Sequence, residues 1–183
     1  SGPVTLTGHG HAVKDLDVSP GGTYAVSAAC SEVKAGECMS GEIKLWDLAE
    51  GKCMDTLTVH QGGVTKVGFS PAGDYIVTAG GDKKLRLWQV RNPHGIMEIT
   101  GFDKRANAVD FAPDGKTFLI GDSEGKLKIF QPGTQGPKRS VYSDDADFQT
   151  VAYSSDGSLI MGGCPDGSIH VYGAGDGKTV VSI

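Results

Sequence analysis

Apolar and polar residues alternate within short stretches of the chain, and turn-forming residues separate these stretches. In the best-defined part, the apolar positions are Val64, Val67, Phe69, Tyr75, Val77, Leu85 and Leu87. A period near two is typical of half-buried β-strands, whereas an amphipathic helix repeats its apolar positions every three or four residues. The pattern therefore predicts four strands in this part of the chain, at 64–70, 75–80, 84–90 and 94–100.

Turn sequences lie between the expected strands. They are Pro-Ala-Gly at 71–73, Pro-Asp-Gly at 113–115, Ser-Asp-Gly at 155–157 and Asp-Gly at 166–167. Glycine, Asn and Asp supply the positive φ that tight hairpins need. We therefore expect consecutive strands to pair as antiparallel hairpins.

The same pattern recurs with a period of 42 residues. Aromatic residues that close a strand follow one another at this spacing, at Trp46, Trp88, Phe130 and Tyr172. A fixed period of this length indicates a repeat architecture. The sequence predicts an all-β protein with four four-stranded antiparallel blades, which is a half or partial β-propeller, in one segment over residues 1–183. The repeats are expected near 8–58, 59–100, 101–142 and 143–183.

The first repeat is longer than the others. Pro71 and Pro113 are 42 residues apart, whereas Pro20 precedes Pro71 by 51 residues. The nine extra residues fall within SEVKAGECMS, between Cys30 and Gly41. Because this stretch is polar and contains glycine, we expect it to form a surface loop.

Two sequence landmarks in the repeats are similar to those of the WD-repeat β-propeller family. The first repeat runs from Gly8-His9 to Trp46-Asp47, and the second has His60 and Trp88 with Gln89 in place of the Asp. The family's repeats have about 40 to 45 residues between such landmarks. The resemblance covers almost the whole chain and implies a propeller that acts as a protein-interaction scaffold.

The resemblance also implies a hydrogen-bond network in each well-formed blade. In the second repeat its members would be His60, Thr78, Asp82 and Trp88. In the first they would be His9, Ser27 and Trp46, with Ser40 at the place of the Asp. We interpret these residues as structural rather than catalytic, because a buried His or Asp is costly unless it is paired.

The two later repeats have lost most of this network. At the four places, in order, the sequence reads Phe102, Ile120, Glu124 and Phe130, and then Asp144, Gly162, Asp166 and Tyr172. Phe and Tyr keep the aromatic bulk but lack the indole N–H donor. We therefore expect these two blades to rely on apolar packing.

Docking positions are also implied by the family, whose partners often bind beside the start of the innermost strands. Transferred by the period, the positions with polar side chains are Lys14, Thr65, Arg105, Asn107, Asp147 and Gln149. Loops and strand ends on a rigid scaffold are common binding sites. The expected partners are other proteins.

Charge and composition exclude several classes of function. The chain has 17 basic and 22 acidic residues, and non-specific binding to nucleic acids depends on clustered basic residues, so we expect no nucleic-acid partner. Its longest apolar runs are far shorter than the roughly 20 residues of a membrane-spanning helix, so we expect no membrane association. The expected location is the cytoplasm, with the cytoskeleton or a cilium as narrower expectations.

The four cysteines form no CxxC pair. They lie at Cys30, Cys38, Cys53 and Cys164, which is sparse for a protein of 183 residues. Reduced thiols in a cytosolic protein are the first expectation. A bridge between Cys30 and Cys38 is the alternative.

No motif for a cofactor, a metal ion or catalysis is complete. The stretch from Gly173 to Thr179 resembles a phosphate-binding loop, but Tyr172 stands where its first glycine is needed. The pair His9 and His11 has no third ligand at a recognisable spacing. Asp144, Asp145 and Asp147 lack the calcium-loop pattern. We expect no cofactor, no metal ion and no enzyme activity.

Four repeats make only half of a ring of about eight blades. Residues 3–7 align with an outer strand, so they are expected to complete a preceding blade. Two alternatives follow: the segment belongs to a larger propeller, or two copies associate into one eight-bladed ring. A propeller enzyme with a site in the central channel is the alternative from another functional class.

Overall fold

Four antiparallel sheets make up the protein. The computed structural model describes residues 4–100, 106–134, 136–142 and 147–182. Each sheet has four strands, and its strands are paired in their order along the chain. No helix occurs in these residues. The all-β class and the four four-stranded blades predicted from the sequence are therefore confirmed.

The strands of the four sheets have the following bounds. The first sheet contains β1 (Val13–Val18), β2 (Tyr24–Lys34), β3 (Glu37–Asp47) and β4 (Lys52–Gln61). The second contains β5 (Val64–Phe69), β6 (Tyr75–Gly80), β7 (Leu85–Gln89) and β8 (Asn92–Ile99). The third contains β9 (Ala106–Phe111), β10 (Phe118–Asp122), β11 (Lys126–Phe130) and β12 (Arg139–Tyr142). The fourth contains β13 (Thr150–Tyr153), β14 (Leu159–Gly163), β15 (Ile169–Gly173) and β16 (Thr179–Ser182).

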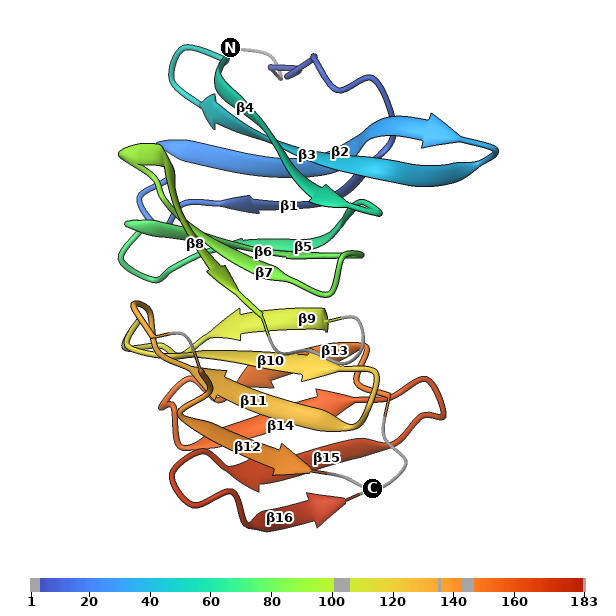
Figure 1. Cartoon of the computed structure of the whole chain (residues 1–183). Helices are drawn as coiled ribbons and strands as arrows, with labels where there is room; N and C mark the ends of the chain where they lie inside the picture. Colours follow the sequence, from blue (N-terminus) through green and yellow to red (C-terminus); the bar gives the residue numbers. More distant parts are fainter. Residues whose placement is uncertain (1–3, 101–105, 135, 143–146, 183) are drawn as a thin grey trace.

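The sheets follow one another in a stack, with the two ends of the chain at opposite ends (Figure 1). Strand β1 contacts β5, β5 contacts β9, and β9 contacts β13, so that the first strands of the four sheets lie in one row. The sheets are therefore arranged as successive blades around one side of a propeller.

Carboxylates join neighbouring sheets at two of the three junctions. Asp17 Oδ2 accepts a hydrogen bond from the Phe69 backbone N–H at 2.7 Å, and Asp110 Oδ2 accepts one from the Tyr153 N–H at 2.8 Å. The equivalent position in the second sheet is Gly68, which has no side chain to make this bond. At that junction Thr65 Oγ1 lies 3.2 Å from Ala106 O instead.

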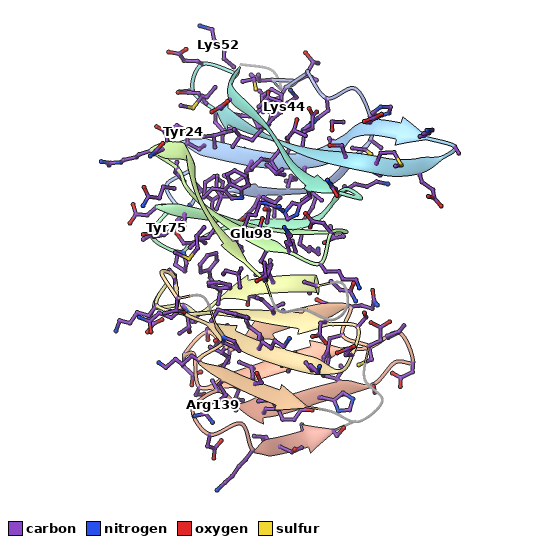
Figure 2. The ribbon with its side chains drawn as sticks, in the orientation of Figure 1. Tyr24, Lys44, Lys52, Tyr75, Glu98 and Arg139 are labelled. Carbon is purple, nitrogen blue, oxygen red and sulfur yellow. A yellow bond between two sulfur atoms is a disulfide. The ribbon has the colours of Figure 1, made fainter. Side chains whose placement is uncertain are left out.

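Apolar side chains fill the three spaces between the sheets. Val26 and Ile43 of the first sheet pack with Ile76 and Trp88 of the second, and similar clusters occupy the other two spaces. The repeat extends to the edges of the sheets, where Tyr24 and Tyr75 lie on the same side of the molecule (Figure 2). The period found in the sequence is thus a period of packing as well.

The inserted residues of the first repeat form an extended hairpin, so the prediction of a surface loop was wrong. Strands β2 and β3 continue through the insertion to a turn at Ala35 and Gly36, whose φ angles are 52° and 83°. This hairpin projects beyond the neighbouring strands (Figure 1). The polar composition misled the prediction, because an exposed hairpin needs no apolar face once its strands pair with each other.

Cys30 and Cys38 form a disulfide across this hairpin, with their Cα atoms 5.8 Å apart. The first expectation of reduced thiols was therefore wrong for this pair, and the alternative was correct. Register shifts near Cys30 and Glu32 bring the two cysteines together, although neither faces the other in the pairing. Cys53 and Cys164 are free.

The strand expected at residues 3–7 does not form over 4–7, the part of it that the structure describes. The segment instead runs past the first sheet, where Gly8 lies beside the side chains of Trp46 and Lys44. A strand needs a neighbour with free backbone groups, and no strand pairs with this segment.

Candidate functional site

A buried histidine joins the first sheet to the second. His60, near the end of β4, is only 3% exposed, and its Nε2 lies 2.9 Å from Thr78 Oγ1 on β6. The indole N–H of Trp88 on β7 donates to the same Thr78 oxygen at 3.0 Å. Gly80 leaves room for the histidine ring, because a Cβ atom there would overlap it.

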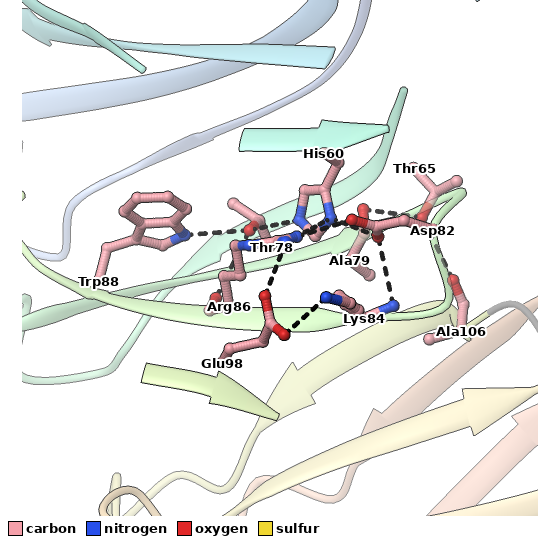
Figure 3. Close-up of polar contacts among 10 residues, drawn as sticks. All are labelled: His60, Thr65, Thr78, Ala79, Asp82, Lys84, Arg86, Trp88, Glu98 and Ala106. Atoms are coloured by element: carbon pink, nitrogen blue, oxygen red, sulfur yellow. Dashed lines mark hydrogen bonds and ion pairs between the residues drawn. The ribbon is translucent and has the colours of Figure 1, made fainter. Parts of the chain in front are cut away.

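Charged residues continue this network to the surface (Figure 3). His60 Nδ1 is 2.7 Å from Asp82 Oδ1, and Arg86 Nη1 donates to Asp82 Oδ2 at 2.9 Å. The other guanidinium nitrogen of Arg86 donates to Glu98 on β8 at 2.8 Å. With a proton on His60 Nδ1, donation runs from Trp88 to Thr78, then to His60 and on to Asp82. Arg86 Nη1 also lies 2.7 Å from His60 Nδ1, but it can donate to that nitrogen only in the other tautomer.

Burial sets the protonation of this network. Burial lowers the pKa of His60, and this effect outweighs the hydrogen bond to Asp82, which raises the pKa. For Asp82, burial raises the pKa, but hydrogen bonds from His60 and Arg86 reverse the balance and lower it. The arrangement therefore holds a neutral imidazole beside a charged carboxylate at neutral pH.

The sequence missed Arg86 and Glu98 as members of this network. These residues are cross-strand partners in the pairing of β7 with β8, and opposite charges at such positions attract each other. The alternation of the two strands could have suggested the pair, but only after their register was known.

The first sheet contains a similar network with a different acid. His9 Nε2 is 2.6 Å from Ser27 Oγ, and Trp46 Nε1 donates to the same oxygen at 2.8 Å. His9 Nδ1 is 2.6 Å from Glu42 Oε1. The family pattern put Ser40 at the acid position of this network. In the structure Glu42 on β3 fills that role instead, because its side chain is long enough to reach the His9 ring.

In the fourth sheet an aromatic ring takes the place of the histidine. Phe148 is completely buried, and it lies against Gly162, where an added Cβ atom would overlap its ring. Gly162 is the period equivalent of Thr78. The 42-residue period put Phe102 and Asp144 at the histidine position of the third and fourth repeats. Both residues lie outside the described residues. This blade does rely on apolar packing, as expected.

Most of the predicted docking positions lie on one hollow at the start of the inner strands. We call it the docking hollow; its volume is about 820 Å³. Its lining includes four of the predicted residues, namely Lys14, Thr65, Asn107 and Gln149. Asp147 lies next to it and accepts a hydrogen bond from Asn107 Nδ2 at 3.1 Å. Arg105 lies outside the described residues.

The inserted hairpin supplies lining residues that the sequence did not predict. Cys30, Glu37 and Cys38 face the docking hollow together with Gly62 and Gly63. Nothing in the sequence placed them there, because a loop of unknown path has no predictable neighbours. The wall formed by the hairpin makes this hollow different from one built by regular repeats.

Acidic residues also line the inner side of the stack. Asp15, Asp17 and Asp110 face a cavity of about 280 Å³ together with Lys66. Each of the three carboxylates contacts another sheet. Asp15 Oδ2 accepts from the Val67 N–H at 2.9 Å, and Asp17 and Asp110 accept from backbone N–H groups of the following sheet. Burial raises the pKa of Asp110.

The described residues include neither a metal-binding cluster nor a membrane-spanning helix. No group of three or more His, Cys, Asp or Glu residues is arranged there to hold a metal ion. The same part of the chain includes no helix with the length and apolar character needed to cross a membrane.

Comparison with known families gives one match. The model of the WD domain, G-beta repeat (WD40), matches residues 3–47, 51–89 and 137–173. The unmatched region between 89 and 137 includes most of the third repeat, which has lost the His and Trp landmarks.

Curated relatives match about half of the chain. Nuclear distribution protein PAC1-2 of Uncinocarpus reesii is 33% identical over 98 residues, which is 48% of this chain and 21% of that protein. Probable coatomer subunit beta' of Schizosaccharomyces pombe is 29% identical over 99 residues, or 53% of this chain and 11% of that protein. WD repeat-containing protein 90 of Mus musculus is 32% identical over 85 residues, or 45% of this chain and 4% of that protein. The aligned part thus spans about a fifth or less of these relatives.

Proposed function

The chain belongs to the WD40-repeat family, since the family model covers more than half of its residues, and on this basis we propose that it is a non-catalytic scaffold for protein–protein interaction in the assembly of a larger complex. The observation that carries the proposal is the docking hollow. Its lining comes from the starts of successive inner strands, so a partner there would contact several blades at once.

The lining chemistry fits a protein partner. Lys14 and Glu37 offer charges of both signs, and Asn107 and Gln149 offer amide groups that donate and accept hydrogen bonds. Polar groups of both kinds are common at the rim of non-obligate interfaces. We infer that the partner presents a polar surface with complementary charges.

The names of the relatives support a narrower proposal about location. Several are nuclear distribution proteins, and one is a coatomer subunit. We propose that this chain acts in the cytoplasm, as part of an assembly associated with the cytoskeleton.

Substitutions in the docking hollow test the scaffold function. Proximity labelling in the native cell would compare the unmodified chain with the double variant Lys14→Glu, Gln149→Arg. We expect the double variant to lose a defined set of labelled proteins. The matched control is Lys178→Glu in the exposed turn before β16, which should keep the set. Identical sets for all three chains would contradict the proposal.

A second proposal concerns the two ends of the stack, where apolar side chains are exposed. Val67 and Phe69 are 6% and 7% exposed, but Leu16 and Val18, one repeat earlier, are 63% and 46% exposed. At the other end, Ile169 is 46% exposed, whereas its equivalents Leu85 and Leu127 are buried. Residues equivalent to those on the two exposed faces are packed against each other at the three junctions between sheets. The two faces therefore match each other as neighbouring sheets do within the molecule.

We propose that a second copy of the chain covers these faces, so that two copies form an eight-bladed ring. Light scattering over a dilution series should then give twice the chain mass of 19.0 kDa. The variant Leu16→Glu should give the mass of one chain. A single-chain mass for the unmodified protein at every concentration would rule out this arrangement.

The inner cavity supports the non-catalytic proposal rather than a channel enzyme. Asp15, Asp17 and Asp110 all accept backbone hydrogen bonds from a neighbouring sheet. Holding neighbouring sheets together accounts for these carboxylates in structural terms, without a catalytic role.

A further inference from the structure

We propose that Cys30 and Cys38 form a reversible thiol–disulfide exchange site, and that its redox state controls the shape of the docking hollow. This inference rests on the proposed function, because a change of the hollow matters only if a partner binds there. The chemical partner is a small thiol of the glutathione class.

The position of the disulfide is the first observation. Both sulfur atoms belong to the β2–β3 hairpin, and both cysteines line the docking hollow. The hairpin owes its length to the insertion, which the other three repeats lack. The insertion therefore brings both a covalent link and a wall to the proposed binding site.

The hairpin rests directly on the chain segment that forms the lip of the hollow. Cys38 Sγ would lie 2.9 Å from a Cβ atom added to Gly63, whose φ is +86°. A Cβ atom on Gly41 would lie 2.5 Å from Val64 N. Contacts this close require glycine at both positions, so β3 and the start of β5 are packed backbone against backbone.

Backbone hydrogen bonds carry this contact further. Gly62 N–H donates to Met39 O at 2.9 Å, and Gly81 N–H donates to Gly63 O at 2.9 Å. Met39 follows Cys38 directly, and Gly62 lies two residues after His60. A shift of the hairpin at Cys38 is thereby passed to the lip and to the turn that holds Asp82.

The local pairing depends on the disulfide more than a regular hairpin would. Register shifts interrupt the β2–β3 pairing between Cys30 and Glu32 and again between Glu32 and Val33. Such bulges leave residues unpaired and weaken the ladder. The disulfide spans this irregular part, so its loss removes a constraint at the place where the pairing is interrupted.

The exposure of the two sulfur-bearing residues suggests the order of the reaction. Cys30 is buried at 4% exposure, whereas Cys38 is partly exposed. A glutathione thiolate therefore attacks Cys38 Sγ, the S–S bond breaks, and Cys30 leaves as a thiolate that takes up a proton. A second glutathione thiolate attacks the sulfur of the bound glutathione. Cys38 is released as a thiol, and glutathione disulfide forms. The reverse sequence re-forms the protein disulfide.

The proposed location gives this exchange its importance. Disulfides of cytosolic proteins are usually transient and serve in catalysis or redox sensing, because glutathione keeps most thiols reduced there. A disulfide in a docking wall would thus report the redox state of the cell to the partner.

The test uses the chain with Cys53→Ser and Cys164→Ser, which leaves only the pair. After equilibration in glutathione buffers of graded redox poise, thiol titration should show a transition between no free thiol and two. In the reduced form, hydrogen exchange at Gly62 and Gly81, whose N–H groups donate across this contact, should be several-fold faster, and trypsin should cleave faster after Lys34 near the hairpin tip. The variant Cys30→Ser, Cys38→Ser should show the fast exchange in every buffer.

Two results would overturn the inference. One is a cysteine pair that keeps a single redox state in all the buffers; the other is hydrogen exchange at Gly62 and Gly81 that does not depend on that state. Neither result touches the scaffold function, which the variant Lys14→Glu, Gln149→Arg tests in one fixed buffer. If those substitutions abolish partner labelling but reduction changes nothing, the scaffold stands and the redox control fails.

Discussion

Asp17 and Asp110 make the same contact in two different sheets. Each carboxylate accepts a hydrogen bond from a backbone N–H of the following sheet, Asp17 from Phe69 and Asp110 from Tyr153. The two residues are equivalent in the repeat, so the structure uses one device twice to join neighbouring blades.

Loss of this contact should destabilise the protein. We expect Asp17→Ala to lower the free energy of unfolding by about 1–3 kcal/mol, because the Phe69 N–H would lose a charged acceptor at a packed junction. Asp114→Ala, in an exposed turn, is the matched control and should change little. Denaturant titration measures both. Equal stability of the two variants would show that the contact contributes nothing.

The raised pKa of Asp110 gives stability a dependence on pH. The folded state holds the proton of this carboxyl more tightly than the unfolded state, whose pKa is near 3.8. Stability therefore falls as the pH rises from that value through the higher folded pKa. Asp110→Asn retains an oxygen for the Tyr153 N–H but removes this titration. The difference in unfolding free energy between the unmodified chain and the variant should change across this pH range, and a constant difference would contradict the prediction.

His60 should act in the opposite direction and at higher pH. Its pKa is lower in the folded state than the ordinary 6.5, so the unfolded state takes up a proton first on acidification. Stability is complete above pH 6.5 and is lost as the pH falls below it toward the folded pKa. Thermal unfolding at pH 7.5 and 5.5 should show this loss, and His60→Gln should reduce it. An equal loss in the variant would assign the effect to other groups.

Trp88 contributes both its bulk and its N–H group, and two substitutions separate them. Trp88→Ala should cost about 3–5 kcal/mol of stability, because it leaves a large cavity between the first two sheets. Trp88→Phe keeps most of the volume but removes the donor to Thr78, so about 1 kcal/mol should be lost through the hydrogen bond. Urea denaturation gives both values. Similar losses for the two variants would mean that the bulk of the indole contributes little.

Gly162 and Phe148 should depend on each other. Gly162→Ala places a methyl group against the Phe148 ring, and overpacking of this kind costs about 1–3 kcal/mol. Phe148→Leu makes room for the methyl group. We therefore expect the double variant to be more stable than the sum of the two single losses predicts, as measured in a double-mutant cycle. Strict additivity would show that the ring moves aside freely.

The sequence predicted the regular parts of this structure well. The 42-residue period gave the number of strands, and the bounds expected in the second repeat agree with β5 to β8 within two residues. Periodicity works here because each blade meets the same neighbours as the last, so one alternating pattern describes all four.

The prediction failed where the chain departs from the repeat. The paths of the insertion and of residues 4–7 depend on which backbone groups find partners, and this is a property of the assembled sheets. Glu42 was missed for a related reason, since the family pattern points to position 40 and only the register shows which side chain reaches His9. Phe148 was missed because the 42-residue spacing assigned the histidine position to Asp144. The residue that fills the space beside Gly162 can be identified only from the packing.

The alternation of acidic and small residues along the inner row has a mechanical consequence. Asp17 and Asp110 tie the first sheet to the second and the third to the fourth with charged acceptors. At the middle junction Gly68 has no such side chain, and among the described residues the polar contact there is the neutral one of Thr65. Under a pulling force on the two termini, the molecule should therefore part first in its middle, into two halves of two sheets. The charged ties between sheets thus recur every two blades rather than every blade. Each pair of tied blades should therefore move as one body.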